Sequence, residues 1–182
     1  GVHIEAGEGA AKIGAPERRP LAVQPRVEPW LHGERTPFWS ADLRGTFTGI
    51  DVNTDMSTLS AAIVKGVGFT LSRMINAMAH ARSCPSGVVV AGGGVRLSEM
   101  LRVVQGSVTV PLTILKSFDY LASDGAALSA AEALGVPLDL RHDIETVLEP
   151  NVAFQEDYEA WIAEAGSVAA GVYRVGAGES AG

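Results

Sequence analysis

The stretch VVVAGGGVRLSEMLRVV, residues 88–104, carries the two patterns that decide the fold. Its first four residues predict a short buried strand, and apolar residues from Leu97 to Val104 recur at helical spacing. Three glycines, at positions 92–94, stand between the two. A strand that ends in glycines and leads into a helix presents backbone N–H groups and the positive end of a helix dipole, which suits a phosphate or a nucleotide. Taken alone, the pattern favours a tight strand-to-helix corner over a ligand site.

This glycine loop, residues 92–94, matches neither of two familiar phosphate-binding motifs. G-x-x-x-x-G-K-[ST] is excluded because no Lys-Ser or Lys-Thr pair follows the glycines. G-x-G-x-x-G is excluded because Leu97 stands where its last glycine should be. Arg96 offers a charged donor beside the loop and Ser98 offers a hydroxyl, so a less specific nucleotide site stays open.

A long helix is predicted upstream of the loop. It begins near Asp55 or Ser57 and carries apolar residues at helical spacing as far as Met78. Gly66 and Gly68 lie inside it, and each costs about 1 kcal/mol of helix stability relative to Ala. We therefore expect another segment of the chain to approach the helix closely at these two glycines.

Downstream of the loop, the sequence predicts one more strand and two more helices. Residues 108–115 are apolar and β-branched, and Pro111 indicates either a sheet edge or the start of the strand. Residues 123–135 predict a helix of small side chains that ends at a glycine and packs tightly on a neighbour. A weaker helix is predicted over 154–169. This mixture of strands and helices indicates an α/β fold.

Composition limits the classes of function. With 182 residues, 47% hydrophobic and 19% charged, the chain is predicted to be one globular domain. Its net charge of −7 argues against general nucleic-acid binding, which needs clustered Lys and Arg. The single cysteine, Cys84, excludes an internal disulfide framework and fits a reducing compartment, so we expect a cytoplasmic protein. No apolar run is long enough for a membrane helix.

Other polar and aromatic residues are expected to be structural. Glu34 should be satisfied by local hydrogen bonds, and Asp42 and Arg44 should form a salt-bridged turn. The tryptophans are expected to pack in the interior; they are Trp30, Trp39 and Trp161. The histidines lack partners at metal-ligand spacing, so no metal ligand is assigned. No catalytic residue is assigned either.

Five segments, in order along the chain, resemble the FGGY carbohydrate kinases. PWLHGERTPFWSADLRGTFTGI, residues 29–50, resembles the family's P-[YW]-L-x-G-E-R-x-P…RG…G-[LI] segment, in the form of its xylulokinase and gluconokinase branch. The helix that contains Gly66 is similar to the next helix of the family. VVVAGGGVRLSEML resembles the family's strand and GGGA[KR]S loop. SDGAALSAAEALG and EPNVAFQEDYEAWIAE resemble its last two helices.

The resemblance implies an actin-like, ribonuclease H-like ATPase fold of two domains with a cleft between them. This chain would be part of the second, nucleotide-binding domain, the C-terminal domain of a sugar kinase. By position, the resemblance assigns the nucleotide contacts to Gly92, Gly93, Gly94 and Ser98. The implied ligands are ATP and Mg²⁺, with most of the magnesium site, the sugar site and the catalytic Asp in the first domain.

We expect residues 1–28 to be a poorly ordered N-terminal segment, 29–170 to be the FGGY kinase C-terminal domain and 171–182 to be a disordered tail. The implied function is phosphoryl transfer from ATP to a carbohydrate hydroxyl, by a fragment that is inactive without its sugar-binding domain. The expected partners are ATP and a sugar, but neither a nucleic acid nor a membrane, and a homodimer is left open. The alternatives are a non-catalytic actin-like module that binds another protein, and an unrelated α/β nucleotide-binding domain with a similar loop.

Overall fold

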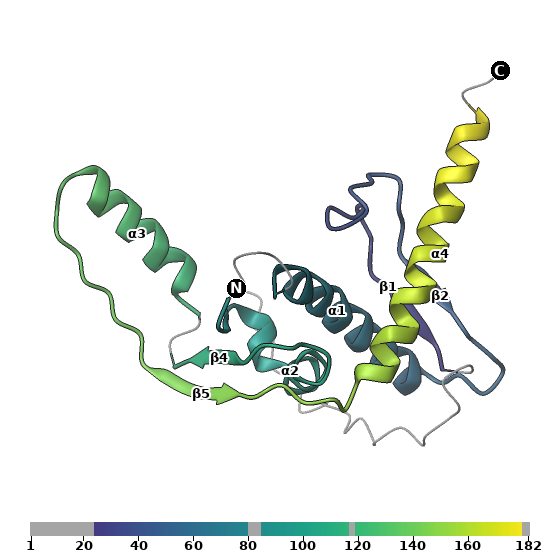
Figure 1. Ribbon diagram of the computed structural model, residues 1–182, viewed down its shortest axis with the longest axis horizontal. Coiled ribbons are helices and arrows are strands. Elements are labelled where there is room, and N and C mark those ends of the chain that lie inside the picture. Colours follow the sequence, from purple (N-terminus) through teal and green to yellow (C-terminus); the bar gives the residue numbers. More distant parts are fainter. Residues whose placement is uncertain (1–23, 80–84, 117–118, 180–182) are drawn as a thin grey trace, which may run out of the picture.

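The computed structural model describes residues 24–79, 85–116 and 119–179, which form two small sheets and four α-helices (Figure 1). The helices are α1 (Met56–Ala79), α2 (Ser98–Gln105), α3 (Leu121–Ala133) and α4 (Gln155–Glu179), and a short 3₁₀ helix, η2 (Gly93–Arg96), precedes α2. The long helix that the sequence predicts upstream of the glycine loop is confirmed as α1. The two helices predicted downstream are confirmed as α3 and α4.

The strands form one antiparallel pair and one three-stranded sheet. In the pair, β1 (Arg26–Glu28) lies antiparallel to β2 (Thr46–Thr48). In the larger sheet, β4 (Leu112–Leu115) is central, with β3 (Val88–Val90) parallel to it on one side and β5 (Ile144–Leu148) antiparallel on the other. The fold is therefore α/β, as the sequence predicts.

Pro111 sets the start of β4. The strand begins directly after the proline, so the ladder never needs the N–H group that proline lacks. The proline carbonyl still serves the sheet, because it accepts a hydrogen bond from the N–H of Val88 at 2.9 Å. The prediction of a strand start is thus confirmed, whereas an edge position is wrong because β4 lies between two other strands.

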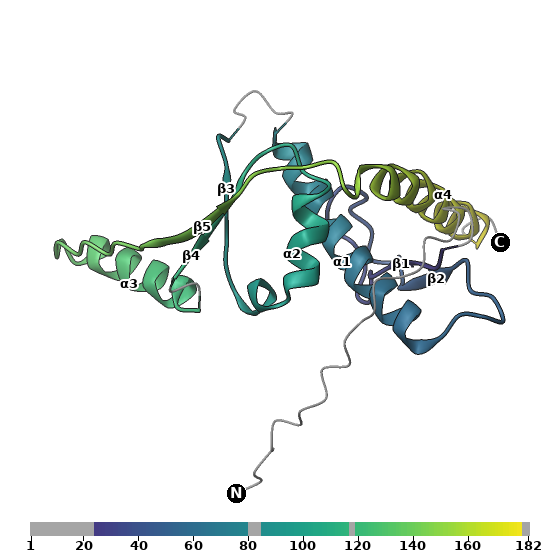
Figure 2. The same cartoon turned by 90° about the horizontal axis from the view of Figure 1, so that it is seen from below.

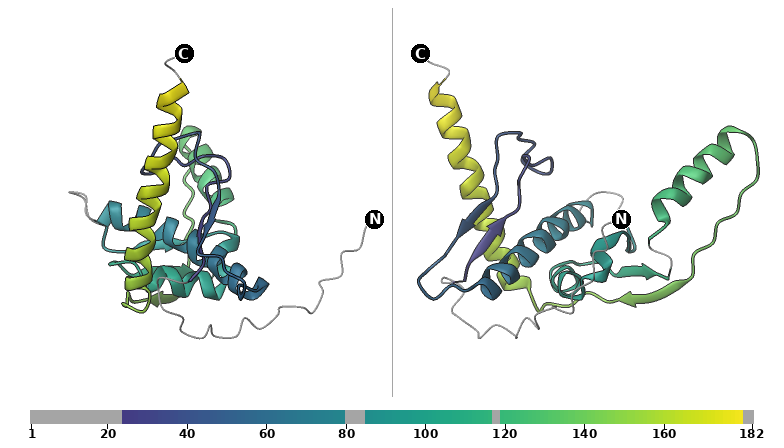
Figure 3. Two further views of the ribbon diagram at one scale, coloured as in Figure 1. Left: turned by 90° about the vertical axis from the view of Figure 1, so that its right-hand side faces the viewer. Right: turned by 180° about the vertical axis from the view of Figure 1, so that it is seen from behind.

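One core forms where α1, α4 and the segment after β1 meet, and Figure 3 shows α4 running beside β1 and β2. Trp161 of α4 is 2% exposed, and its indole N–H donates to the carbonyl oxygen of Val27 at 3.0 Å. Its ring lies 5.9 Å from that of Phe69, centroid to centroid. The predicted interior positions of Trp30 and Trp161 are confirmed. The same prediction for Trp39 is wrong, since that side chain is 79% exposed.

A second core joins α1 and α2 to one face of the three-stranded sheet. Ile75 of α1, Val104 of α2 and Leu112 of β4 are buried together in it. The opposite face is largely uncovered by the described residues. Val89 and Val147 are register partners of the same β4 residue, share that opposite face, and are both exposed. Sheets with parallel strands are usually buried on both faces, so this face lacks its usual cover.

The two glycines inside α1 lie where other segments approach the helix, as predicted. A side-chain carbon at Gly66 would overlap the carbonyl oxygen of Val27 in β1. One at Gly68 would come within 2.7 Å of a methyl carbon of Val103 in α2. Both glycines are buried. Their cost to the helix is therefore offset by the close packing of β1 and α2 against it.

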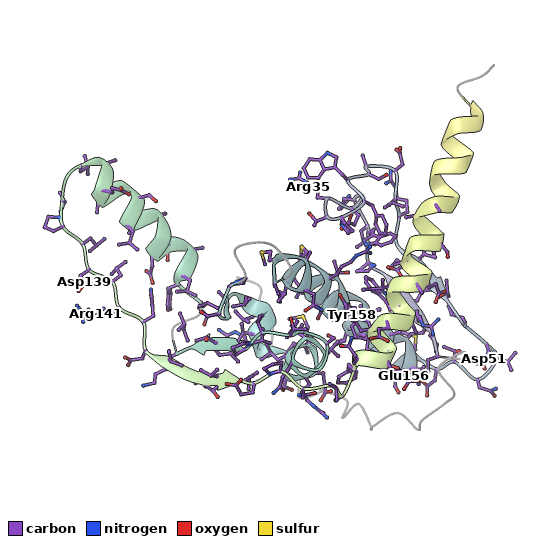
Figure 4. The ribbon with its side chains drawn as sticks, in the orientation of Figure 1. Arg35, Asp51, Asp139, Arg141, Glu156 and Tyr158 are labelled. Carbon is purple, nitrogen blue, oxygen red and sulfur yellow. The ribbon has the colours of Figure 1, made fainter. Side chains whose placement is uncertain are left out.

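Helix α3 and the segment that leads into β5 project from the rest of the molecule as an arm (Figures 1 and 2). None of the α3 residues is buried, so the predicted tight packing of this helix is wrong among the residues that the structure describes. The predicted glycine stop is confirmed by Gly135, whose φ of +65° follows the helix end. Asp139 and Arg141 form an exposed ion pair at 2.9 Å on the same arm, far from Tyr158 of α4 (Figure 4).

The ends of the described chain differ from the expected segments. Residues 171–179, which the sequence predicts to be a disordered tail, continue α4 as far as Glu179. Residues 26–28, within the segment predicted to be poorly ordered, form β1. The rest of that prediction, over residues 1–23, lies outside the described residues.

The loop before β2 is held by Glu34, as predicted. Its carboxylate accepts hydrogen bonds from the N–H groups of Thr36 and Phe38, both at 2.9 Å. The salt-bridged turn at Asp42 and Arg44 is not observed. Instead, the Arg44 guanidinium donates to two backbone carbonyls, and Ser40 accepts from the N–H of Asp42. The backbone carbonyls of Ala41 and Leu43 are thus the hydrogen-bond partners of this guanidinium in place of the predicted carboxylate.

Candidate nucleotide-binding site

The glycine loop lies at the carboxyl edge of the three-stranded sheet. β3 and β4 are parallel, so the segments that follow them leave the sheet at the same edge. The glycine loop follows β3, and Asp119 follows β4. Arg96, at the end of η2, forms an ion pair with Asp119 and joins the two segments. In open α/β sheets, ligands bind in the crevice outside the carboxyl ends of the strands.

The backbone of the glycine loop is accessible. All three glycines are exposed, and a side-chain carbon at Gly92 or Gly93 would have no neighbour within 4 Å. Gly92 has a φ of +88°, a conformation that glycine adopts readily and other residues rarely do. Gly94 differs, because a side-chain carbon there would come within 2.6 Å of the Met100 methyl group. The open side of the loop is therefore at Gly92 and Gly93.

Ser98 begins α2 and is exposed beside this loop. The residue before it, Leu97, provides no side-chain hydrogen bond to the start of the helix. Glu99 places an acidic group in the first helical turn, where it lies near Arg102 with 3.4 Å between the charged atoms. The structure thus brings all four sequence-predicted contacts to one edge of the sheet. Their role as nucleotide ligands stays a prediction.

A small pocket lies elsewhere, between β1, α1 and α4. Its volume is about 20 Å³, room for about one water molecule. Lys65 and Asp157 line it and form an ion pair at 2.6 Å. No glycine-loop residue lines this pocket, and its size does not suit a nucleotide.

A buried carboxyl group in β1 is the ionisable feature that sequence reasoning missed. Glu28 is 2% exposed, and neither of its carboxyl oxygens has a hydrogen-bond partner. The pKa of Glu28 is raised to about 8, mainly by burial and also by the nearby Glu164 carboxylate, against the opposing effect of Arg73 and Arg26. Glu164 is itself paired with Arg26 at 2.5 Å. A three-residue strand gives no periodic signal that would mark Glu28 as buried.

Within residues 24–79, 85–116 and 119–179, no three His, Cys, Asp or Glu side chains lie together so as to hold a metal ion. The resemblance places most of the implied Mg²⁺ site in the first domain, and no part of a reaction is assigned to a metal on the described residues. None of the described helices is long and apolar enough to cross a membrane. Cys84 lies outside the described residues.

Comparison with known proteins identifies the family of this chain. The model of the family described as "FGGY family of carbohydrate kinases, C-terminal domain" matches residues 4–136. The chain belongs to the FGGY family. It is 28% identical over 131 residues to a xylulose kinase of Staphylococcus epidermidis. This match covers 72% of this chain and 26% of that protein. It is 31% identical over 88 residues to a gluconokinase of Bacillus subtilis. That match covers 46% of this chain and 17% of that protein.

The fold agrees with that of FGGY kinases. A crystal structure of ligand-bound xylulose kinase from Lactobacillus acidophilus matches with a TM-score of 0.69 and 21% identity, over 85% of this chain and 33% of that chain. The predicted actin-like fold, as a partial C-terminal domain, is confirmed. The chain spans about a quarter of the length of the FGGY xylulose kinase from Staphylococcus epidermidis.

Proposed function

We propose that this chain forms the nucleotide-binding wall of an ATP-dependent sugar kinase, whose acceptor is a pentulose or gluconate-type hydroxyl. The observation that carries the proposal is the open backbone at Gly92 and Gly93, at the carboxyl edge of the sheet in an FGGY C-terminal domain. The similarity to xylulose kinases and gluconokinases supports the acceptor class. A cytoplasmic location belongs to the same proposal, supported by the single cysteine.

In the proposed function, the glycine loop and Ser98 position the nucleotide. Phosphoryl transfer depends mainly on holding the donor in line with the acceptor and on stabilising developing charge. The glycine loop would let the nucleotide approach the main chain, and Ser98 would add a hydroxyl beside it. Mg²⁺, when bound, would neutralise phosphate charge, but the described residues contribute no cluster to hold it. The acid–base chemistry on the sugar is assigned to no residue of this chain.

We predict that the purified 182-residue chain turns over no sugar. Transfer needs both walls of a cleft, and the described residues supply the nucleotide wall only. The measurement is ADP release with D-xylulose, D-gluconate and glycerol as acceptors, compared with ATP alone. Sugar-dependent ADP release at the rates typical of kinases, about 1–100 s⁻¹, would contradict the proposal.

Nucleotide binding is tested at Gly92. Gly92→Ala should weaken ATP binding by about tenfold, because a residue with a Cβ pays about 1–3 kcal/mol to hold a φ of +88° with a ψ of 177°, and the loop would leave the conformation that exposes its backbone to the nucleotide. The measurement is an NMR titration of the ¹⁵N-labelled chain with millimolar ATP. Gly125→Ala is the matched control, since Gly125 has open space around it in α3 and should leave binding unchanged. Equal affinity in both variants would argue against the glycine loop as the site.

A second candidate function rests on a separate observation. The bare sheet face at Val89 and Val147 and the unpacked helix α3 leave apolar surface exposed on adjoining elements. Surface of this kind marks a protein interface in many folds. A non-catalytic module that binds another protein would use this surface and would bind no nucleotide, so the ATP titration separates the two functions.

A further inference from the structure

Glu28 of β1 is buried beside α1 and α4, and neither of its carboxyl oxygens has a hydrogen-bond partner. The charged groups that act on it are Arg26 of its own strand, Arg73 of α1 and Glu164 of α4. Tyr158 of α4 lies near the same Arg73. Burial is the main cause of the raised pKa of Glu28, and the two arginines do not offset it. Such a carboxyl group is tolerated in the interior while it is neutral, because ionisation without a partner or water is costly.

Two side-chain contacts hold α4 against β1, and both use residues next to Glu28 in the strand (Figure 3). The Trp161 indole N–H donates to the carbonyl oxygen of Val27 at 3.0 Å, and Arg26 pairs with Glu164 at 2.5 Å. A change of charge at Glu28 therefore acts directly beside the contacts that keep α4 in place.

Glu164 stays ionised over the pH range in which Glu28 changes its charge. Partial burial acts to raise the pKa of Glu164, but hydrogen bonds from Thr48 and Arg26 outweigh burial and hold that pKa below its usual value. Arg26 and Glu28 are two positions apart in β1, so their side chains share one face of the strand. Once Glu28 is ionised, the two carboxylates repel each other and compete for the Arg26 guanidinium.

Of the two helices beside Glu28, α4 is the one that can move at the smaller cost. α1 contributes Phe69 to the core between α1 and α4 and Ile75 to the second core, so displacing α1 breaks both cores. α4 contributes buried residues to the first of these cores only, and no described element follows it. Its start is tied to the end of α2, because the N–H of Phe154 donates to the carbonyl oxygen of Gly106 at 3.0 Å. α4 can therefore swing away from β1 about its start.

We propose that Glu28 is a proton-controlled latch for α4. With the proton bound, the neutral carboxyl group lets α4 close on β1. When the proton leaves to solvent, Arg26 turns from Glu164 to Glu28, water reaches the carboxylate, and α4 releases its Trp161 contact. The latch does not depend on nucleotide binding, because none of its residues belongs to the glycine loop.

The test follows solvent exchange of the Trp161 indole N–H by NMR on the full ¹⁵N-labelled chain. This proton exchanges when its bond to Val27 opens, so its protection, corrected for the intrinsic exchange rate, reports the closed state of α4. Protection should fall by about fiftyfold between pH 6 and pH 8, because each opening that ionises Glu28 releases one proton. At every pH it should be lower than that of the Val104 amide in the second core, which exchanges through global unfolding. Glu28→Gln cannot ionise, so its protection should be equal at both pH values.

Glu164→Gln tests whether Arg26 changes its partner. The variant removes the repelling carboxylate and leaves Arg26 to Glu28, so protection should stop falling at a lower pH than in the wild type. Glu145→Gln is the matched control, since Glu145 is an exposed strand glutamate in β5 and its change should keep the wild-type pH dependence. An unchanged spectrum of the second core shows that each variant is folded.

Each other outcome overturns the proposal in a recognisable way. If the Trp161 indole and the Val104 amide are equally protected at every pH, the chain opens only globally and α4 is not a separate latch. If wild-type protection is the same at pH 6 and pH 8, or if Glu28→Gln keeps the fall, Glu28 does not control the opening. If Glu164→Gln levels off at the wild-type pH, Arg26 does not change partners and the proposed release is wrong.

Discussion

Glu28→Gln is expected to stabilise the chain at pH 8 and above, and to change its stability little at pH 5. Glu28 is buried without a hydrogen-bond partner, and burial raises its pKa from 4.5 to about 8 in the folded state. Between these two values the folded chain keeps the proton, whereas the unfolded chain releases it. The free energy of unfolding is therefore highest below pH 4.5, falls as the pH rises toward 8 and levels off above it.

The expected size of this loss is on the order of 5 kcal/mol between pH 4.5 and pH 8. Glutamine stays neutral at every pH, so the variant should lack this slope. Denaturant unfolding between pH 5 and 9 measures it. The lowered pKa of Glu164 acts below that range, and the raised pKa of Tyr158, above 10, acts beyond it.

Glu145→Gln provides the control for the Glu28 experiment. Glu145 is also a strand glutamate, but it is exposed in β5, and its change should leave the pH slope of stability as it is in the wild type. A wild-type stability that is flat from pH 5 to 9 would show that Glu28 is not a buried neutral carboxyl group. The same conclusion would follow if Glu28→Gln destabilised the chain equally at all pH values.

Gly66→Ala is expected to destabilise the chain by about 3 kcal/mol, the upper end of the cost of overpacking a well-packed site. The added carbon would overlap the carbonyl oxygen of Val27, which is backbone and cannot rotate away. That same oxygen accepts the indole N–H of Trp161 at 3.0 Å, so moving it disturbs α4 as well as β1. Urea unfolding at neutral pH measures the change.

Gly166→Ala is the matched control for Gly66→Ala. Gly166 also lies inside a helix, but it is exposed in α4, and a side-chain carbon there has no neighbour within 4 Å. The alanine should therefore stabilise the chain by about 1 kcal/mol, its intrinsic helix preference. Opposite signs for the two substitutions are the expected result. A stabilising Gly66→Ala would mean that β1 does not pack on α1 as described.

Some of the fold could be predicted because its signals are local. A few neighbouring residues were enough to predict four features: the helical spacing of α1, the two glycines inside that helix, the start of β4 at Pro111 and the glycine that ends α3. The same holds for the glycine loop, since a strand, three glycines and a helix follow one another directly. The nucleotide contacts at this loop stay a prediction, and they came from the family resemblance and not from the local pattern.

Other features could not be predicted from local pattern. β5 carries no buried face to mark it, and its pairing with β4 depends on residues about thirty positions away. Trp39 is exposed although tryptophan usually packs in the interior, because nothing in its loop supplies a cover. The alanines of α3 predict a neighbour, but the helix stands unpacked among the described residues.

The residues alone were enough to identify the family, the order of the four α-helices and the glycine-bearing turn between β3 and α2, because each signal lies in residues close together along the chain. The packing of distant segments leaves open space beside Gly92 and Gly93 but brings Met100 close to Gly94, pairs Arg96 with Asp119 across the sheet edge, and buries the Glu28 carboxyl group without a hydrogen-bond partner. These depend on which distant segments come together, since burial and pairing are properties of the packed chain and not of its local pattern.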